Sequence, residues 1–382
     1  KYNPKYDIIH NYNNSSAESL INKYKYDFVI KDNGLCSGKG VRLYNYNNYK
    51  LGHTYISNLL KNNFTDKCLI EEKLYGKEFV LMSFCDGINI KHMPIVLDFK
   101  KIRLGSDVNT GSMGCIVQSD HSLPFLNESE ISEAGNLNYN IMRLLSEDTN
   151  YKGILYGSFM KTDEGIKLIE YNARFGDPEC LVIFEILKTD LGKIFMAINN
   201  QTLDEIDIEY ENKNVICKYL VPPGYPEEPI KDVEFVLDNN DVIQAGLKLE
   251  DNKLFLNGSR TLAVLKKGDN FENIYQEIEK DIEDIKEYLE YRDDIGFNYI
   301  DEKIKLKTCD KNLSLYEKSG VNIEEGNSVV DKIKDLVLST HNKYVIGNWG
   351  DFGGMFDISN YIIDNNIKNA TLINSMDGVG TK

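Results

Sequence analysis

Short apolar runs separated by glycine-rich or polar turns dominate the first half of the chain. Such runs predict β-strands, because strands in globular proteins are about 4–8 residues long. They lie at residues 26–30, 41–44, 68–74, 78–84, 155–161 and 167–171. Apolar positions at helical spacing predict helices over 51–62 and 128–145, and an apolar helix follows residue 179. Strands interleaved with helices indicate an α/β architecture.

From residue 206 the pattern changes to closely spaced short strands followed by one strongly charged helix. The strands are predicted at 215–221, 233–237, 246–249, 253–257 and 261–265. The helix is predicted over 270–291, with isoleucines at 274, 278, 282 and 285 as its apolar line. This pattern predicts a small β-rich cap domain of α+β type with one covering helix.

The charge of the chain limits the classes of ligand. The formal net charge is −16 over 382 residues, which argues against a broad basic face that binds nucleic acid. A phosphorylated ligand must therefore meet a local basic cluster. No apolar run approaches the roughly 20 residues of a membrane-spanning helix, and residues 1–20 lack a signal-peptide core. Seven scattered cysteines without a Cys-x-x-Cys pair predict reduced thiols. We expect a cytoplasmic protein.

Lys31 and the glycine loop after it form the first candidate site. Lys31 lies at a strand end and precedes Gly34, Gly38 and Gly40, with Lys39 as a second cation. Glycine lets backbone N–H groups approach phosphate oxygens closely. The segment lacks the G-x-x-x-x-G-K-[ST] pattern and leads into a strand, so it is not a Walker P-loop. The alternative is a glycine-rich hairpin with solvated lysines.

Glu170 and Asn172 form the second candidate site. Residues two apart on a strand share a face, so these side-chain oxygens converge. A carboxylate and an amide oxygen suit Mg²⁺, or Mn²⁺, that also binds phosphates and water. Arg174 follows on the same face, where it could steady a transferring phosphoryl group, and Asp177 lies on the next turn. The alternative is a polar strand end in which Asp177 caps the next helix.

A third candidate lies in an acidic strand. The backbone at Glu72 and Leu74 could pair with an adenine edge, while Glu78 could accept hydrogen bonds from ribose hydroxyls. Glu71 belongs to the same run. The alternative is a solvated strand face.

Together these elements resemble the ATP-grasp ligases. The amino-acid sequences of their motifs resemble those of the glycinamide ribonucleotide synthetase (phosphoribosylamine–glycine ligase) family. The motifs are VIKDNGLCSGKGV (29–41), LIEEKLYGKEF (69–79), NTGSMG (109–114), YKGILYGSFM (151–160), IEYNARFGDPEC (169–180), NGSRTLAV (257–264) and YRDDIGFNYI (291–300). The resemblance covers residues 1–302. It implies an ATP-grasp domain over 1–205 and a β-rich cap domain over 206–302. The N-terminal domain of the family is expected to be missing.

The resemblance also implies roles for individual residues. Lys31, Lys39 and the Gly34, Gly38 and Gly40 loop would hold the ATP phosphates. Glu71, Glu72, Leu74 and Glu78 would hold the adenosine. Glu170 and Asn172 would bind the metal, Arg174 and Asp177 would be catalytic, and Lys100, Lys101, Asn109, Thr110 and Gly111 would bind glycine and 5-phosphoribosylamine. The implied reaction joins these two substrates at the expense of ATP, through a glycyl phosphate, in purine synthesis.

Two residues depart from the family pattern. Phe99 stands where the family has a histidine, and Ser112 replaces a glycine in the N-T-G-G run. Both fall where the substrate contacts are expected. Two alternatives therefore remain. The protein could be another ATP-grasp carboxylate–amine ligase with a different acceptor, or a degenerate ATP-binding scaffold.

The tail resembles the start of a second family. YEKSGVNIEEGNSVVDKIK (316–334), GDFGGMFDI (350–358) and MDGVGTK (376–382) are similar to aminoimidazole ribonucleotide synthetase. The resemblance implies a linker at 303–313 and a truncated cyclo-ligase start at 314–382. A second nucleotide and metal site would include Asp377, Gly378, Gly380 and Lys382. A multifunctional chain that forms a homodimer through this domain is expected; for Asp377 and Gly378 the alternative is a simple turn.

Overall fold

The structure is a computed structural model. It describes residues 2–10, 14–32, 40–61, 67–106, 108–237, 242–283, 285, 288–297, 343–346 and 355–366. The chain divides into two units, Lys1–Leu306 and Lys307–Lys382. Each unit is described by itself.

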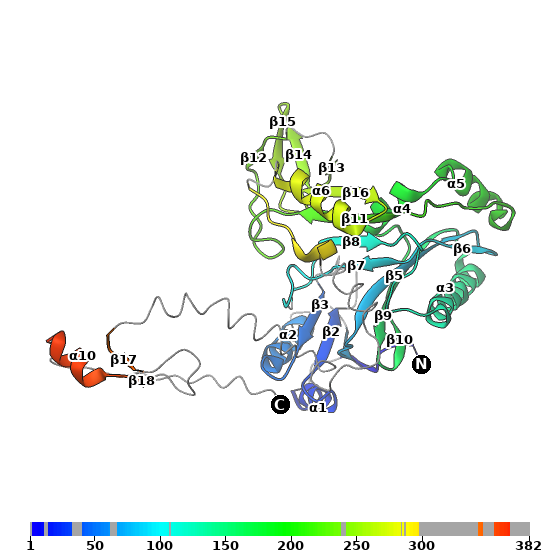
Figure 1. Cartoon of the computed structure of the whole chain (residues 1–382). Coiled ribbons are helices and arrows are strands. Elements are labelled where there is room, and N and C mark those ends of the chain that lie inside the picture. Colours follow the sequence, from blue (N-terminus) through cyan, green and yellow to red (C-terminus); the bar gives the residue numbers. More distant parts are fainter. Residues whose placement is uncertain are drawn as a thin grey trace, which may run out of the picture. The chain divides into compact units, whose positions relative to one another are not determined.

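A small antiparallel sheet begins the first unit. Its order is β1 (Tyr6–Ile9), β4 (Cys68–Glu72), β2 (Phe28–Asp32) and β3 (Val41–Tyr44). Helices α1 (Asn14–Lys23) and α2 (Tyr49–Lys61) pack against it (Figure 1). Phe28 and Ile30 are fully buried with Ile56 of α2. Because strand side chains alternate between faces, Lys31 points away from this core.

A nine-stranded sheet forms the centre of the unit. Its order is β10-β9-β5-β7-β8-β11-β16-β13, and β6 pairs with β5. The strands are β5 (Lys77–Cys85), β6 (Ile90–His92), β7 (Val96–Asp98), β8 (Gly114–Val117), β9 (Gly153–Thr162), β10 (Gly165–Asn172), β11 (Asn214–Leu220), β13 (Ile243–Gln244) and β16 (Leu262–Gly268). β8 pairs with β11, so the sheet continues across the predicted boundary at residue 206.

Helices cover both faces of this sheet. α3 (Glu128–Thr149) packs along β5 and β9, as Figure 1 shows, and buries Phe79 and Phe159. β11 shows how the faces are divided. Its Val215, Cys217 and Tyr219 share a core with α4 (Glu179–Ile186) and α5 (Leu191–Asn200), followed by a short 3₁₀ turn, η1 (Leu203–Glu205). Its Ile216 and Leu220 pack on α6 (Phe271–Glu283).

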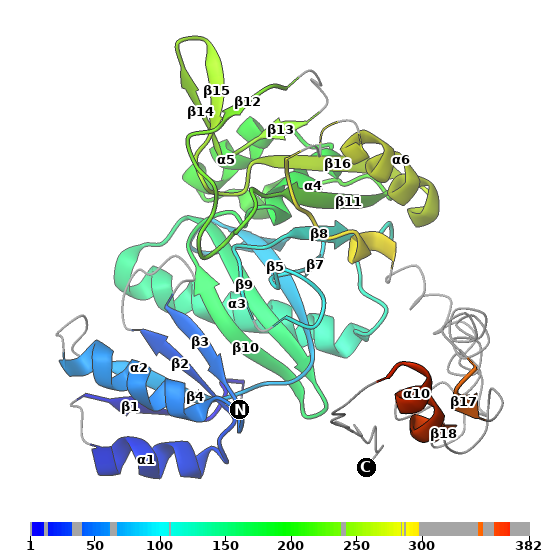
Figure 2. The same cartoon turned by 90° about the vertical axis from the view of Figure 1, so that its left-hand side faces the viewer.

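The remaining strands are short. β12 (Glu234–Phe235), β15 (Lys253–Leu256) and β14 (Leu247–Glu250) make a three-stranded sheet above β16 and β11 (Figure 2). In the second unit, β17 (Val345–Ile346) pairs with β18 (Met355–Phe356), and α10 (Ile358–Asp364) follows. The predicted site residues Asp377, Gly378, Gly380 and Lys382 lie outside the described residues.

The predicted mixed α/β architecture is confirmed, with corrections to individual elements. The hairpin of β9 and β10 and the helix α3 occur where the sequence predicts them. The helix predicted over 270–291 is wrong at its C-terminal end, because α6 ends at Glu283. Glu290 instead pairs with Val221 beside β11. Within the described residues, no helix combines the length and apolar character needed to cross a bilayer.

Candidate nucleotide and substrate site

Lys31 joins the small sheet to the large one. Its Nζ lies 2.7 Å from Glu71 Oε2 and donates to the Ile169 carbonyl at 3.3 Å. The register of β9 and β10 shifts between Leu168 and Glu170, so the intervening residue leaves the regular ladder. The Asp32 N–H donates to the Gly40 carbonyl at 3.0 Å and closes the glycine loop.

The C-terminal end of β10 holds the predicted metal ligands. Glu170 is exposed, and Asn172 Nδ2 donates to Glu170 Oε1 at 3.2 Å. The structure therefore brings the two side chains together as the strand period predicts. The guanidinium of Arg174 turns back, donating to the Phe175 carbonyl at 2.8 Å and lying 5.9 Å from the Tyr156 ring centroid.

Lys100 connects the predicted substrate loop to the same strand pair. Its Nζ donates to Ser158 Oγ at 3.1 Å and lies 3.5 Å from Glu78 Oε2. Ser158 is paired in register with Glu170. Burial lowers the pKa of Lys100, but the carboxylates of Glu78, Asp98 and Glu170 outweigh burial and hold that pKa above its usual value. Lys100 thus keeps its positive charge beside the candidate metal ligands.

Two buried acids lie behind Lys100. Asp98 is 6% exposed, and its carboxylate oxygens have no hydrogen-bond donor among the described residues. Burial and the nearby Glu179 raise the pKa of Asp98 to about 8, although Lys100, 4.0 Å away, opposes the rise. Glu179 is 2% exposed and accepts a 2.6 Å hydrogen bond from the Tyr156 hydroxyl. These acids and Lys100 make a polar cluster inside the sheet.

The predicted substrate residues form a folded loop between β7 and β8. Thr110 donates to the Lys100 carbonyl from both its N–H, at 2.7 Å, and its hydroxyl, at 2.8 Å. Lys101 and Asn109 form an isolated bridge. Gly114 lies at the end of this loop. A Cβ atom added to Gly114 would lie 2.3 Å from the carbonyl oxygen of Cys217. Only glycine permits this approach to β11.

Arg260 fastens this loop to the loop after β10. Its guanidinium donates to the carbonyls of Gly111, at 2.7 Å, and Asp177, at 2.7 Å, and to Asp177 Oδ2 at 2.8 Å. The Tyr219 hydroxyl donates to Asp177 Oδ1 at 2.6 Å. Asp177, predicted to be catalytic, therefore has both carboxylate oxygens engaged.

The predicted adenosine residues fall into two groups. Glu71 faces Lys31, and Glu72 accepts from the Lys5 N–H at 2.8 Å, both at the small sheet. Leu74 lies in the connection from β4 to β5, whereas Glu78 begins β5 and faces Lys100. Gly34, Gly38 and Lys39 lie outside the described residues.

Sequence reasoning missed several residues of this site. They are Asp98, Ser158, Glu179, Tyr219, Arg260 and Arg292. Glu179, Arg260 and Arg292 stand inside motifs that the sequence singles out, so their presence in those motifs was an available signal. Ser158 also stands inside such a motif, YKGILYGSFM (151–160), whereas Asp98 and Tyr219 lie in strands outside the quoted motifs.

Two family models match the chain. Residues 3–180 match the ATP-grasp (A) domain of phosphoribosylglycinamide synthetase, and residues 215–298 match its C domain. A phosphoribosylamine–glycine ligase of Methanocaldococcus jannaschii is 39% identical over 280 residues, which is 70% of this chain and 63% of that protein. One from Methanococcus maripaludis is 38% identical over 307 residues, or 76% of this chain and 69% of that protein.

Solved structures agree with these matches. The crystal structure of a phosphoribosylamine–glycine ligase from Thermotoga maritima has a TM-score of 0.63 and 26% identity, covering 77% of this chain and 74% of its own. A biotin carboxylase domain of Hydrogenobacter thermophilus 2-oxoglutarate carboxylase, 14% identical with a TM-score of 0.55, shares the fold; it covers 80% of this chain and 68% of its own. The matched part of the chain spans less than two thirds of the length of some of these relatives. It covers 63% of the Methanocaldococcus protein and 65% of a phosphoribosylamine–glycine ligase from Methanococcus vannielii. By its two domain matches and these relatives, the chain belongs to the phosphoribosylglycinamide synthetase family, with an ATP-grasp fold.

Proposed function

We propose that the protein ligates glycine to 5-phosphoribosylamine and cleaves ATP to ADP and phosphate. The glycine carboxylate attacks the γ-phosphate and releases ADP, and the amine then displaces phosphate from the resulting acyl phosphate. One observation carries the proposal. Lys100 donates to Ser158 of β9, which pairs in register with Glu170 of β10, and this contact brings the substrate loop beside the candidate metal ligands. The names of the relatives support the reaction class, and the family resemblance supports a role in purine synthesis.

ATP would lie between the small sheet and β10. Lys31 would leave Glu71 and contact phosphate oxygens, since it is the cation that already spans this junction. The loop closed by Gly40, with Gly34, Gly38 and Lys39, would supply N–H groups and a second charge. Glu71, Glu72, Leu74 and Glu78 would hold the adenosine.

Glu170 and Asn172 would hold Mg²⁺ or Mn²⁺. Both side chains carry a hard oxygen atom on one face of β10, and they meet through the hydrogen bond from Asn172 Nδ2 to Glu170 Oε1 at 3.2 Å. Such a pair fits a cation that keeps other positions for phosphates and water. The ion would neutralise charge on the phosphates during transfer. Among the described residues, no group of three His, Cys, Asp or Glu side chains forms a metal cage. A two-residue ligand set leaves coordination positions for phosphate oxygens and water.

The acceptor would lie over the loop that contains Lys100, Lys101, Asn109, Thr110 and Gly111. Lys100 keeps its charge and would orient anionic groups. Arg174 is exposed and could turn toward the transferred phosphoryl group. Asp177 would act by fixing its loop through Arg260.

The direct test is ADP release by the full-length natural protein with Mg·ATP and phosphoribosylamine, with and without glycine. Glycine-dependent ADP release with glycinamide ribonucleotide as product supports the proposal. ADP release that needs a different carboxylate or amine would favour another ATP-grasp ligase. Nucleotide binding without turnover would favour a degenerate scaffold.

Glu170→Ala tests the metal assignment. We expect it to lower kcat at least a hundredfold, because the carboxylate is the only charged ligand in the proposed pair. Glu164→Ala is the matched control: this glutamate is exposed in the same hairpin and pairs with Lys167. Unchanged turnover in Glu170→Ala would remove Glu170 from the site.

We also propose that residues 314–382 begin an aminoimidazole ribonucleotide synthetase-like domain, with 303–313 as linker. The tail motifs support this. Asp377, Gly378, Gly380 and Lys382 would belong to its nucleotide site, and a homodimer would form through that domain. Because residues 314–382 would hold only the start of that domain, the test is ATP-dependent cyclisation of formylglycinamidine ribonucleotide by the full-length natural polypeptide. No cyclisation by protein that is active as the glycine ligase would refute it.

A further inference from the structure

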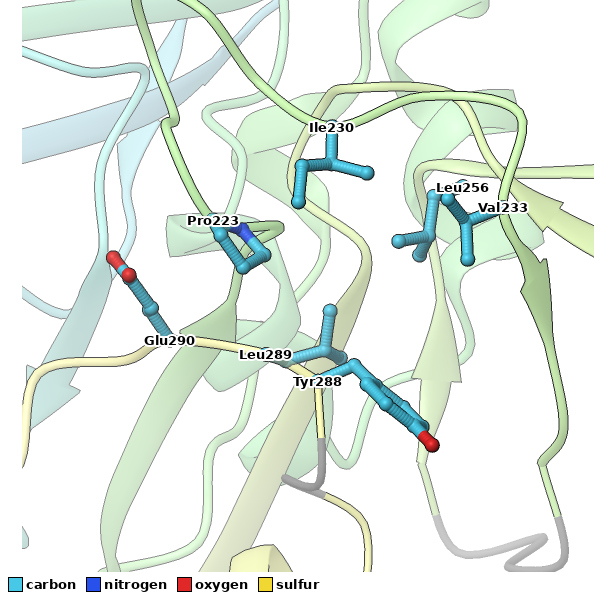
Figure 3. A pocket seen from close by; sticks show the side chains of 7 residues that line it. All are labelled: Pro223, Ile230, Val233, Leu256, Tyr288, Leu289 and Glu290. Carbon is cyan, nitrogen blue, oxygen red and sulfur yellow. The ribbon is translucent and has the colours of Figure 1, made fainter.

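The segment 289–296, here called the strap, connects the covering helix α6 to the substrate loop. The N–H groups of Val221 and Glu290 each donate to the other's carbonyl at 2.8 Å, which adds the strap to the end of β11. Leu289 is 7% exposed, and Figure 3 shows its side chain pointing toward Leu256 and Ile230. The carboxylate of Glu290 points away from this apolar group (Figure 3). The strap is therefore anchored in the core.

A buried lysine holds the strap further along. Lys218 of β11 is fully buried and donates to the Asp293 carbonyl at 2.9 Å. Its Nζ also lies 4.4 Å from the Tyr275 ring centroid and pairs with Glu279 at 2.5 Å. Ile295, two residues after Asp293, is completely buried. The backbone is thus fixed on both sides of Arg292.

Arg292 reaches from the strap to the substrate loop. It is 6% exposed, and its Nε and Nη2 donate to the two carboxylate oxygens of Asp294, at 2.9 and 2.5 Å. This fork fixes the plane of the guanidinium. Nη1 then donates to the Lys101 carbonyl at 3.0 Å, and the Phe99 ring centroid lies 5.2 Å away. Arg292 therefore touches the residues on either side of Lys100.

We propose that Arg292 is a positioning residue that sets the substrate loop for the amine acceptor. This inference rests on the proposed function. Arg292 holds the Lys101 carbonyl, and Thr110 holds the Lys100 carbonyl from the other side of the loop. The backbone on both sides of Lys100 is therefore already ordered before the acceptor binds. Binding then needs no additional free energy to order this loop around the Lys100 ammonium. The nucleotide contacts at Lys31 belong to another sheet and do not depend on it.

Arg292→Lys tests the proposal, since lysine keeps the charge but cannot reach Asp294 and Lys101 together. We expect the KM for phosphoribosylamine to rise about tenfold, as for one lost charge-assisted hydrogen bond, with the KM for ATP within twofold of the wild type. The matched control is Arg143→Lys, because Arg143 lies on the solvent-exposed side of α3 and pairs with Glu147 at 3.8 Å. An unchanged acceptor KM, or equal rises for acceptor and ATP, would overturn the proposal.

Hydrogen exchange gives a readout that does not need turnover. In Arg292→Lys we expect faster exchange at the amides of Ile102 and Thr110, which close the loop, and unchanged exchange in β2. Unchanged loop exchange would refute the positioning role. If the wild type forms no ADP with glycine while the loop amides respond as expected, the proposed function fails and the positioning role stands. If Arg292→Lys does not fold, Asp294→Asn loosens the same guanidinium and should give the same exchange pattern.

Discussion

Ser112 occupies a backbone conformation that favours glycine. Its φ is +100°, and the family pattern has glycine at this position. The serine compensates with its hydroxyl, which donates to the Gly114 carbonyl at 3.0 Å and accepts from the Gly114 N–H at 3.1 Å. Because Ser112 is 2% exposed, water cannot replace these bonds. The departure from the family pattern is therefore stabilised locally.

This balance predicts different effects for two substitutions. Ser112→Gly loses the hydroxyl but relieves the strained φ, so its free energy of unfolding should stay within about 1 kcal/mol of the wild type. Ser112→Ala loses the same bonds and keeps the strain, so it should be less stable than Ser112→Gly by about 1–2 kcal/mol. Urea unfolding of the three proteins measures both differences. Equal stability of the two variants would contradict the strain argument.

Asp98 should make stability depend on pH. Its folded-state pKa is about 8, against an ordinary value of 3.8, so the native state retains a proton that the unfolded chain releases. Stability from this group is complete below pH 3.8 and is lost as the pH rises toward 8. Asp98→Asn lacks the titration. Its stability relative to the wild type should rise by about 2–3 kcal/mol between pH 5.5 and 7.5, measured by urea unfolding. A constant difference would show that Asp98 is ionised in the native state.

Sequence alone could place the residues whose partners are close in the chain. Glu170 and Asn172 meet because the strand period puts them on one face, and Lys31 follows from the same alternation. Arg260 could not be placed, since it contacts Gly111 across 149 positions and Asp177 across 83. Such contacts depend on the order of strands in the sheet. That order depends here on β7 and β8. These two strands are too short to show the alternation of apolar and polar residues that predicts a strand.

At the scale of elements, α6 is joined to β11 by more than its isoleucines. Lys218 extends from the centre of β11 to Glu279 on α6, and the Tyr291 hydroxyl donates to the other Glu279 oxygen at 2.8 Å. Burial lowers the pKa of Lys218 despite this pair. Glu279 retains 24% of its side-chain exposure, whereas Lys218 has none. The two partners therefore differ in how well they tolerate loss of the other.

This asymmetry predicts that Glu279→Ala is more destabilising than Lys218→Met. The first leaves a buried ammonium without its carboxylate and should cost about 3 kcal/mol. The second places an apolar chain between aromatic rings and leaves a glutamate that can turn to water. Chemical unfolding of both single variants and the double variant gives the coupling energy. A larger cost for Lys218→Met would mean that the ion pair is the main stabilising contact.

At the scale of the whole first unit, the nucleotide is proposed to bridge two sheets. Lys31 links them through one side chain, in addition to the hydrogen bond from the Leu168 N–H to the Tyr2 carbonyl, and the bound nucleotide should add further contacts and hence stability. At a hundred times its Kd, Mg·ADP should stabilise the protein by about 2.7 kcal/mol, and EDTA should remove most of that gain. Thermal unfolding measures the shift, with Lys31→Met as the variant expected to lose it. A shift that persists in EDTA would show binding without the metal.

The pairing of β8 with β11 also has a consequence for synthesis of the chain on the ribosome. β8 ends at Val117, and its partner begins at Asn214. All four residues of β8 are buried in the finished sheet. A nascent chain that has produced β5 to β10 therefore still presents an unpaired apolar strand edge, which can associate with other chains until β11 emerges. A ribosome that pauses before residue 214 would therefore prolong the exposure of that edge.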